Sequence, residues 1–188
     1  SATCKRFIKI NMKKIGILGG GVWGSALAKL LSNSSVCIFT RNEKIVKSIN
    51  EHKFNPILKY AVFNENVTAT LDLTDLQKTD YLIIALPSQN IREVLKNYSI
   101  KKQSQQIIIA SKGIEIETKL FLKDVVSELI NAENISILSG PCFSQEVAQN
   151  LPTAVTLATS DRMNFNDINL LFENKNFRLY FSDDLIGC

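Results

Sequence analysis

Short runs of apolar residues recur along the chain, separated by segments in which apolar residues return every three or four positions. The runs are uninterrupted, which is typical of strands buried on both faces of a sheet, and the spacing between them is that of helices with one buried face. The pattern predicts strands at 15–18, 36–39, 67–69, 81–85, 107–110 and 135–138, with helices at 26–31, 43–50, 72–78, 91–95 and 120–130.

Alternation of strand and helix at this spacing predicts right-handed β-α-β units, and therefore an α/β fold with a doubly wound, mostly parallel sheet. After Pro141 the rhythm changes, and residues 154–158 and 177–181 are interpreted as extra late strands around a helix at 164–172. No linker rich in Pro, Gly or Ser divides the chain, so residues 12–188 are predicted to form one domain. Residues 1–11 are interpreted as a leader or a cloning remnant.

The first predicted strand ends in a glycine-rich turn, Gly19-Gly-Gly-Val-Trp-Gly24, which matches the pattern G-x-G-x-x-G. In a strand–turn–helix context this pattern is the dinucleotide-binding fingerprint of Rossmann-type folds. Gly19 allows the tight turn, Gly21 lets the backbone approach a pyrophosphate, and Gly24 lets the helix pack against the strand. The competing interpretation is a glycine turn that only joins strand to helix.

The end of the second predicted strand bears on the choice of cofactor. Dinucleotide-binding folds usually carry an acid there, about 20 residues after the glycine turn, that holds the adenosine ribose. This chain instead continues with Arg41, and Glu43 already opens the next helix. A guanidinium can pair with a 2′-phosphate, so the sequence favours NADP, or tolerance of NADP and NAD. An exposed loop charge is the alternative.

Three further turns follow buried strands, at Ala85–Ser88, Ser111–Gly113 and Ser139–Pro141. Ligands of open parallel sheets bind beyond the carboxyl ends of the strands, so Pro87 is expected to border the cofactor. Lys112 would direct an ammonium group into the same crevice, where it could hold a phosphate or polarise a carbonyl. A solvated lysine and a plain strand-to-helix turn remain the alternatives.

Composition narrows the classes of function. The 188 residues carry 22 Lys and Arg against 18 Asp and Glu, a formal net charge of +4. These charges form no basic stripe with interleaved aromatic residues, so a nucleic-acid partner is not expected. No apolar run reaches the roughly 18 residues that cross a bilayer. A hydrophobic fraction of 45% argues against a disordered chain.

The four cysteines lie far apart in the sequence and the chain has a single histidine, His52. Neither a disulfide framework nor a metal site is therefore predicted. Reduced thiols fit a cytoplasmic location. The sequence leaves a homodimer open.

The motifs together resemble the bacterial type of NAD(P)-dependent glycerol-3-phosphate dehydrogenases, over residues 12 to 187. The resemblance rests on five segments: Gly19–Gly24, Ala85-Leu-Pro-Ser88, Ser111-Lys-Gly-Ile-Glu115, Leu138-Ser-Gly-Pro-Cys-Phe-Ser-Gln-Glu146, and Phe177-Arg-Leu-Tyr-Phe-Ser-Asp-Asp-Leu-Ile-Gly187. It implies reversible hydride transfer between NAD(P)H and dihydroxyacetone phosphate, giving sn-glycerol 3-phosphate for phospholipid synthesis.

The resemblance also implies roles for individual residues. Lys112 falls at the position shared between cofactor and substrate. The other implied cofactor contacts are Val22, Trp23, Arg41, Phe54 and Ser144, and the other implied substrate contacts are Gly140 and Cys142.

This chain departs from the family at several of these positions. The family usually has Ser at 22 and 142 and Ala at 144. Val22 offers only its backbone N–H, and Cys142 is a weaker hydrogen-bond donor than Ser. A small buried hydrophobic residue is the alternative interpretation of Cys142.

In the family, a helical domain follows the position of Gly187 and carries the proton-acceptor lysine. The 188 residues contain no counterpart of that domain, so this chain is expected to bind dinucleotide weakly and to turn over slowly or not at all. The competing readings are a non-catalytic dinucleotide-binding fragment and a related enzyme, such as a ketopantoate reductase or a sugar-nucleotide dehydrogenase. Ser111–Gly113 and Gly140-Pro141 argue against the related enzymes.

Overall fold

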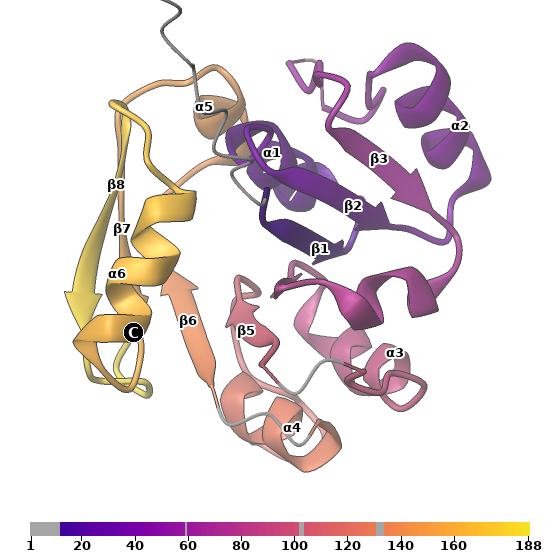
Figure 1. The fold of residues 1–188 in the computed structure, drawn as a ribbon. Helices are drawn as coiled ribbons and strands as arrows, with labels where there is room; N and C mark the ends of the chain where they lie inside the picture. Colours follow the sequence, from indigo (N-terminus) through magenta and orange to yellow (C-terminus); the bar gives the residue numbers. More distant parts are fainter. Residues whose placement is uncertain (1–11, 59, 102–103, 131–133) are drawn as a thin grey trace, which may run out of the picture.

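The computed structural model describes residues 12–58, 60–101, 104–130 and 134–188, and the interpretation of residues 1–11 lies outside this part (Figure 1). Its strands form one sheet of eight in the order β3-β2-β1-β4-β5-β6-β7-β8. Their bounds are β1 Lys14–Leu18, β2 Ser35–Phe39, β3 Val67–Thr70, β4 Tyr81–Ile84, β5 Gln106–Ile109, β6 Ile135–Ser139, β7 Thr153–Ala158 and β8 Phe177–Ser182.

The first six strands are all parallel to their neighbours. Their order, 3-2-1-4-5-6, is that of doubly wound dinucleotide-binding domains. β7 then runs antiparallel to β6, and β8 runs parallel to β7. The prediction of a mostly parallel sheet with extra late strands is confirmed.

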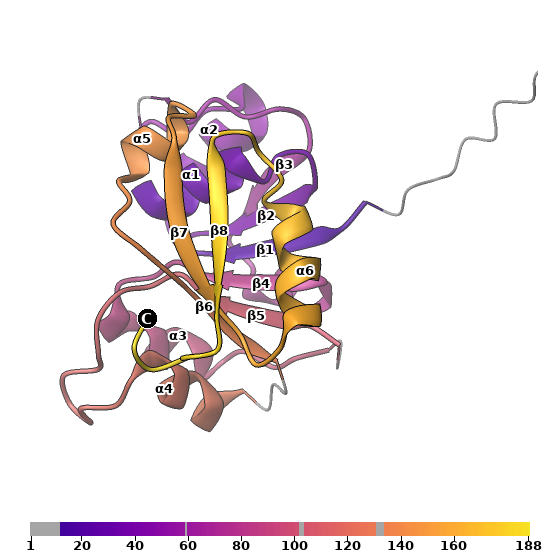
Figure 2. The ribbon, with the colours of Figure 1, turned by 90° about the vertical axis from the view of Figure 1, so that its left-hand side faces the viewer.

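Helices cover both faces of the sheet (Figures 1 and 2). One face packs against α1, α2, α5 and α6, and the other against the 3₁₀ helix η1, α3 and α4. Their bounds are α1 Val22–Leu30, α2 Glu43–His52, η1 Leu73–Lys78, η2 Ser88–Asn90, α3 Ile91–Leu95, α4 Leu122–Leu129, α5 Ser144–Ala148 and α6 Arg162–Leu171.

The uninterrupted apolar runs belong to the central strands, as their two covered faces require. Along β1, Ile15 and Ile17 enter the core under α1, whereas Leu18 enters the opposite core. β4 divides its residues in the same way, with Ile83 on the first side and Ile84 on the second. All of these side chains are fully buried, so both faces of the central strands are covered.

The short helix predicted at 72–78 is a 3₁₀ helix over residues 73–78, with the side chain of Asp72 accepting from the N–H of Thr74. The structure also adds two short elements, one of which is the three-residue η2. The short helix α5 was not predicted, because of its five residues only Val147 and Ala148 are buried and so short a segment shows no period.

Among the residues that the structure describes, no helix is long and apolar enough to cross a membrane.

Candidate functional site

The glycine turn between β1 and α1 has the geometry that the fingerprint predicts. Gly19 has φ +126°, a conformation that side chains other than glycine rarely adopt, and its N–H donates to the Phe39 carbonyl at 3.1 Å. A Cβ on Gly24 would overlap the Gly19 carbonyl oxygen, so only glycine allows α1 to pack this closely. A Cβ on Gly21 would meet no protein atom within 4 Å, so this position faces open space.

The N-terminus of α1 borders that open space. Gly21 is its N-cap, and no side chain accepts a hydrogen bond there, so the first N–H groups of the helix lack the usual side-chain cap. Uncapped N–H groups and the helix dipole favour an anion. The residues present therefore fit the pyrophosphate of a dinucleotide.

A cavity of about 710 Å³ extends from this turn to the end of β2. Its lining includes Gly19–Gly21, residues 40–44, and Ala85–Pro87 after β4. Arg41 lies here, and its guanidinium is 3.7 Å from the carboxylate of Glu93 on α3, with both side chains about 70% exposed. Asn42 also lines this cavity, and its side-chain oxygen accepts from the N–H groups of Lys44 and Ile45 and caps α2.

A second cavity, of about 400 Å³, continues past the ends of β4 and β5. Gly21 and Ala85–Pro87 line both cavities, so the two form one crevice across the carboxyl edge of the sheet. Most of the residues with implied roles line the second cavity: Val22, Trp23, Pro87, Lys112, Cys142 and Ser144.

Lys112 supplies the one charge among the residues that line this second cavity. Its Nζ donates to the Gly140 carbonyl at 3.2 Å, and the side chain is exposed. Lys112 and Gly140 also line a third cavity, of about 240 Å³, together with Ile186 and Cys188. The structure thus brings the implied substrate residues together beside the end of the cofactor crevice.

Trp23 closes one wall of the second cavity. It is half-buried, and its indole N–H donates to the Ala110 carbonyl at 2.9 Å, which ties α1 to the end of β5. Trp23 is the single tryptophan of the chain, so its fluorescence reports on this cavity alone.

Cys142 combines the two interpretations that the sequence offered. Its side chain is half-buried and packs against the core under α1, yet it also lines the Lys112 cavity. Burial raises the pKa of the thiol, and the nearby Lys112 opposes this shift. The residue is therefore a neutral thiol near pH 7.

Phe54 was predicted to contact the cofactor, whereas its neighbour Asn55 was not predicted to have a role. Phe54 is half-buried and pairs with Val62 in an isolated antiparallel bridge, outside the lining of the cavities above. Asn55, by contrast, is fully buried, and its Nδ2 donates to the Gly20 carbonyl at 3.1 Å and to Ser25 Oγ at 2.7 Å. Its partners lie 30 and 35 residues away, so local sequence carried no signal beyond an Asn-Pro turn.

Among the described residues, no three His, Cys, Asp or Glu side chains gather in a way that could hold a metal ion. The cysteines in this part of the chain, Cys37, Cys142 and Cys188, are free thiols.

Comparison with known families adds to this geometry. Residues 14–165 match the model of the NAD-dependent glycerol-3-phosphate dehydrogenase N-terminus. The chain belongs to this family. The match covers the glycine turn, the Lys112 loop and the substrate-side residues, and it agrees with the predicted cofactor, NADP or NAD.

Individual relatives support the same assignment. A glycerol-3-phosphate dehydrogenase [NAD(P)+] of Bacillus licheniformis is 40% identical over 185 residues, and one of Erythrobacter litoralis is 38% identical over 177 residues. The alignments cover 94% and 93% of this chain, but only 54% and 53% of the relatives. The chain therefore spans about half the length of these curated relatives.

The fold matches solved structures as well. The crystal structure of glycerol-3-phosphate dehydrogenase from Coxiella burnetii superposes with a TM-score of 0.86 at 30% identity, covering 94% of this chain and 55% of that one. Family membership favours the glycerol-3-phosphate dehydrogenase reading over a ketopantoate reductase or a sugar-nucleotide dehydrogenase.

Proposed function

We propose that this chain is the cofactor-binding domain of an enzyme that transfers hydride reversibly between NAD(P)H and dihydroxyacetone phosphate, forming sn-glycerol 3-phosphate for glycerophospholipid synthesis. The observation that carries the proposal is the position of Lys112. Its ammonium lies where the nicotinamide end of the crevice meets Gly140 and Cys142, beside the second cavity. When bound, the dinucleotide supplies the hydride.

In this proposal, different residues along the crevice contact different parts of the cofactor and substrate. Gly19–Gly24 and the N-terminus of α1 hold the pyrophosphate, and Arg41 faces the adenosine ribose or its 2′-phosphate. Trp23 and Pro87 line the nicotinamide side. Lys112 places a positive charge next to the substrate phosphate or carbonyl, where it stabilises negative charge.

Besides Lys112, the polar side chains that line this cavity are Trp23, Ser111, Cys142 and Ser144. The indole of Trp23 and the hydroxyl of Ser111 already donate to the Ala110 and Leu86 carbonyls, which leaves the thiol of Cys142 and the hydroxyl of Ser144. A neutral thiol is a weak hydrogen-bond donor, so in this proposal Cys142 contributes shape more than binding energy. Lys112 then carries most of the recognition of the substrate.

For the 188-residue polypeptide assayed by itself, we expect cofactor binding with slow or no turnover. Hydride delivery to a ketone needs a proton donor within hydrogen-bond reach of the oxygen. One of the three N–H groups of the Lys112 ammonium donates to the Gly140 carbonyl, and the role proposed for this side chain is to stabilise charge and not to transfer the proton. We keep a dinucleotide-binding module without catalysis as the second candidate, because the crevice alone would serve it. A cytoplasmic location and a homodimer remain predictions.

The test of the proposal is linkage between substrate and cofactor. We expect dihydroxyacetone phosphate to raise the affinity of the chain for NADPH, because each ligand would help to hold the Lys112 side chain in the position that the other contacts. Linkage makes such a gain reciprocal. Titration of NADPH with and without dihydroxyacetone phosphate, followed through Trp23 fluorescence, measures the effect. Lys112→Met should abolish the gain. The proposed substrate is contradicted if dihydroxyacetone phosphate does not raise the NADPH affinity of the unmodified chain, or if it raises that of Lys112→Met equally.

A further inference from the structure

Lys112 lies on a loop, residues 111–121, that leaves β5 and returns to α4. The motif Ser111–Glu115, which contains Lys112, also contains Glu115. The proposed function assigns no role to this glutamate. Glu115 is a carboxylate with 4% exposure, and a charge at that depth requires partners. Its partners show how the loop is held.

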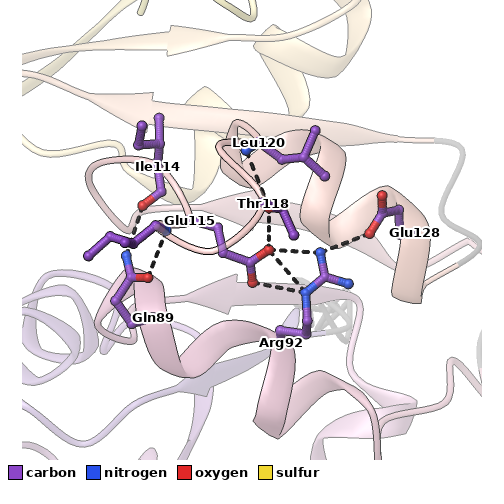
Figure 3. A network of polar contacts seen from close by, with 8 residues as sticks. Gln89, Arg92, Ile114, Glu115, Thr118, Leu120 and Glu128 are labelled. Atoms are coloured by element: carbon purple, nitrogen blue, oxygen red, sulfur yellow. Dashed lines mark hydrogen bonds and ion pairs between the residues drawn. The ribbon is translucent and has the colours of Figure 1, made fainter.

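The partner of Glu115 is Arg92 on α3 (Figure 3). Arg92 Nε donates to Glu115 Oε1 at 2.9 Å and Nη2 donates to Oε2 at 2.8 Å, a two-pronged pairing. The Thr118 hydroxyl donates to the same carboxylate at 2.6 Å. Arg92 also holds Glu128 of α4, at 2.8 Å, but the side chain of Glu128 is 50% exposed.

Gln89 forms a second set of hydrogen bonds, to the backbone of the same loop. The amide of Gln89 donates to the Ile114 carbonyl at 2.8 Å and accepts from the Ile116 N–H at 2.9 Å (Figure 3). Gln89 thus satisfies one backbone group on each side of Glu115. Gln89 lies in η2 and Arg92 in α3, which are contiguous along the chain.

The start of the loop is fixed as well. The hydroxyl of Ser111 donates to the Leu86 carbonyl at 2.6 Å, and Leu86 lines both parts of the cofactor crevice. Lys112 is therefore held between one anchor at Ser111 and another at Ile114–Ile116. Both anchors belong to the segment after β4, residues 86–92.

We propose that Arg92, Glu115 and Gln89 are positioning residues that set the Lys112 ammonium against the cofactor and the phosphate-bearing substrate. The proposal rests on the function proposed above for Lys112. Since the segment that borders the crevice also carries the anchors, the two sides of the cavity keep a fixed separation. Loss of the Arg92–Glu115 pair would leave the Lys112 residue itself unchanged, but its side chain would no longer be held in one orientation.

The experiment compares Glu115→Gln and Arg92→Lys with a matched control, Glu128→Gln. The control neutralises the other carboxylate that accepts from Arg92 Nη2 at 2.8 Å, and Glu128 lies on α4, outside the Lys112 loop. Thr118→Val serves as a milder variant that removes one hydrogen bond from Glu115, should Glu115→Gln fail to fold. Each is titrated through Trp23 fluorescence with NADPH in the presence of dihydroxyacetone phosphate. Each is titrated separately with ADP by calorimetry, because ADP lacks the nicotinamide half and is expected to occupy only the Arg41 side of the crevice, away from Trp23.

We expect Glu115→Gln and Arg92→Lys to weaken NADPH binding roughly tenfold, the worth of about one charge-assisted hydrogen bond, and Thr118→Val to weaken it by less. Their affinity for ADP should stay unchanged, and Glu128→Gln should alter neither. Equal losses for ADP and NADPH would reduce the network to a structural role and overturn the inference, as would unchanged NADPH binding.

Lys112→Met separates the two proposals. If it leaves binding unchanged, the function proposed for Lys112 fails and the positioning role fails with it, whereas a loss in Lys112→Met alone contradicts only the positioning role.

Discussion

At the scale of the residue, Arg41 is the side chain that we propose to recognise the adenosine end of the cofactor. Among the described residues its ion pair is with Glu93, at 3.7 Å on the exposed surface, and such a pair contributes little free energy. A 2′-phosphate can displace that carboxylate at low cost. The side chain is thus available for a ligand.

Arg41→Gln should therefore weaken NADPH binding by about ten- to a hundredfold, the range for a hydrogen-bonded charge pair, and weaken NADH binding far less. Paired titrations of the two cofactors measure this. Glu93→Gln is the matched control, since it leaves Arg41 intact and should raise the affinity for NADPH slightly. Equal losses for both cofactors would assign Arg41 to stacking on adenine instead of phosphate recognition.

Structural roles that depend on nearby residues in the sequence could be predicted. Roles that depend on residues far away in the sequence could not. Gly19, Gly21 and Gly24 act within one turn, so their spacing sufficed. Asn55 braces the same turn through Gly20 and Ser25, but nothing local marks an asparagine for burial.

At the scale of the element, the loop of residues 111–121 depends on the charge of Glu115. The hydrogen bonds from Arg92, then from Thr118, hold the pKa of Glu115 below its ordinary value, and the nearby Lys96 acts in the same direction. The folded state therefore favours the carboxylate. This stabilisation is complete above the unfolded-state pKa and is lost as the pH falls through the lower folded-state pKa.

From this we predict that the stability advantage of the unmodified chain over Glu115→Gln holds at neutral pH and narrows below about pH 4, near the ordinary value for glutamate. Urea unfolding of both proteins across an acid series measures the difference. Other carboxylates with lowered pKa values, Asp72 and Asp184, are common to both proteins and cancel. An advantage that stays constant into acid would show that the charge of Glu115 plays no part.

The long elements with a clear period were predicted from sequence, and so was the five-residue α3, where Ile91 and Leu95 are four positions apart and both buried. The short elements α5 and η2 were not predicted. α2 and α4 each bury one stripe, whereas α5 has five residues and η2 has three. Ser88 illustrates the limit. A serine after Pro87 suggests an N-cap, yet no side chain caps η2, and the Ser88 hydroxyl accepts from Gln89 instead.

At the scale of the whole molecule, sheet order turns scattered motifs into one crevice. β1, β4 and β5 are neighbours although about 90 residues separate the first from the last, so the glycine turn, Pro87 and Lys112 meet at one edge. The parallel order followed from the strand–helix rhythm. The reversal at β7 and the return of residues 185–188 to the Lys112 region depend on tertiary packing, which the local pattern does not encode.

The most direct test of the account is titration of the chain with NADPH, followed through energy transfer from Trp23, with Gly21→Ala beside it. A methyl group on Gly21 meets no protein atom, so the variant should unfold at the same temperature as the unmodified chain, yet its methyl group lies where the pyrophosphate approaches. We expect saturable quenching of Trp23 in the unmodified chain and a loss of affinity for NADPH of at least about tenfold in the variant. Absence of quenching, or equal affinity in both proteins, would contradict dinucleotide binding at this turn.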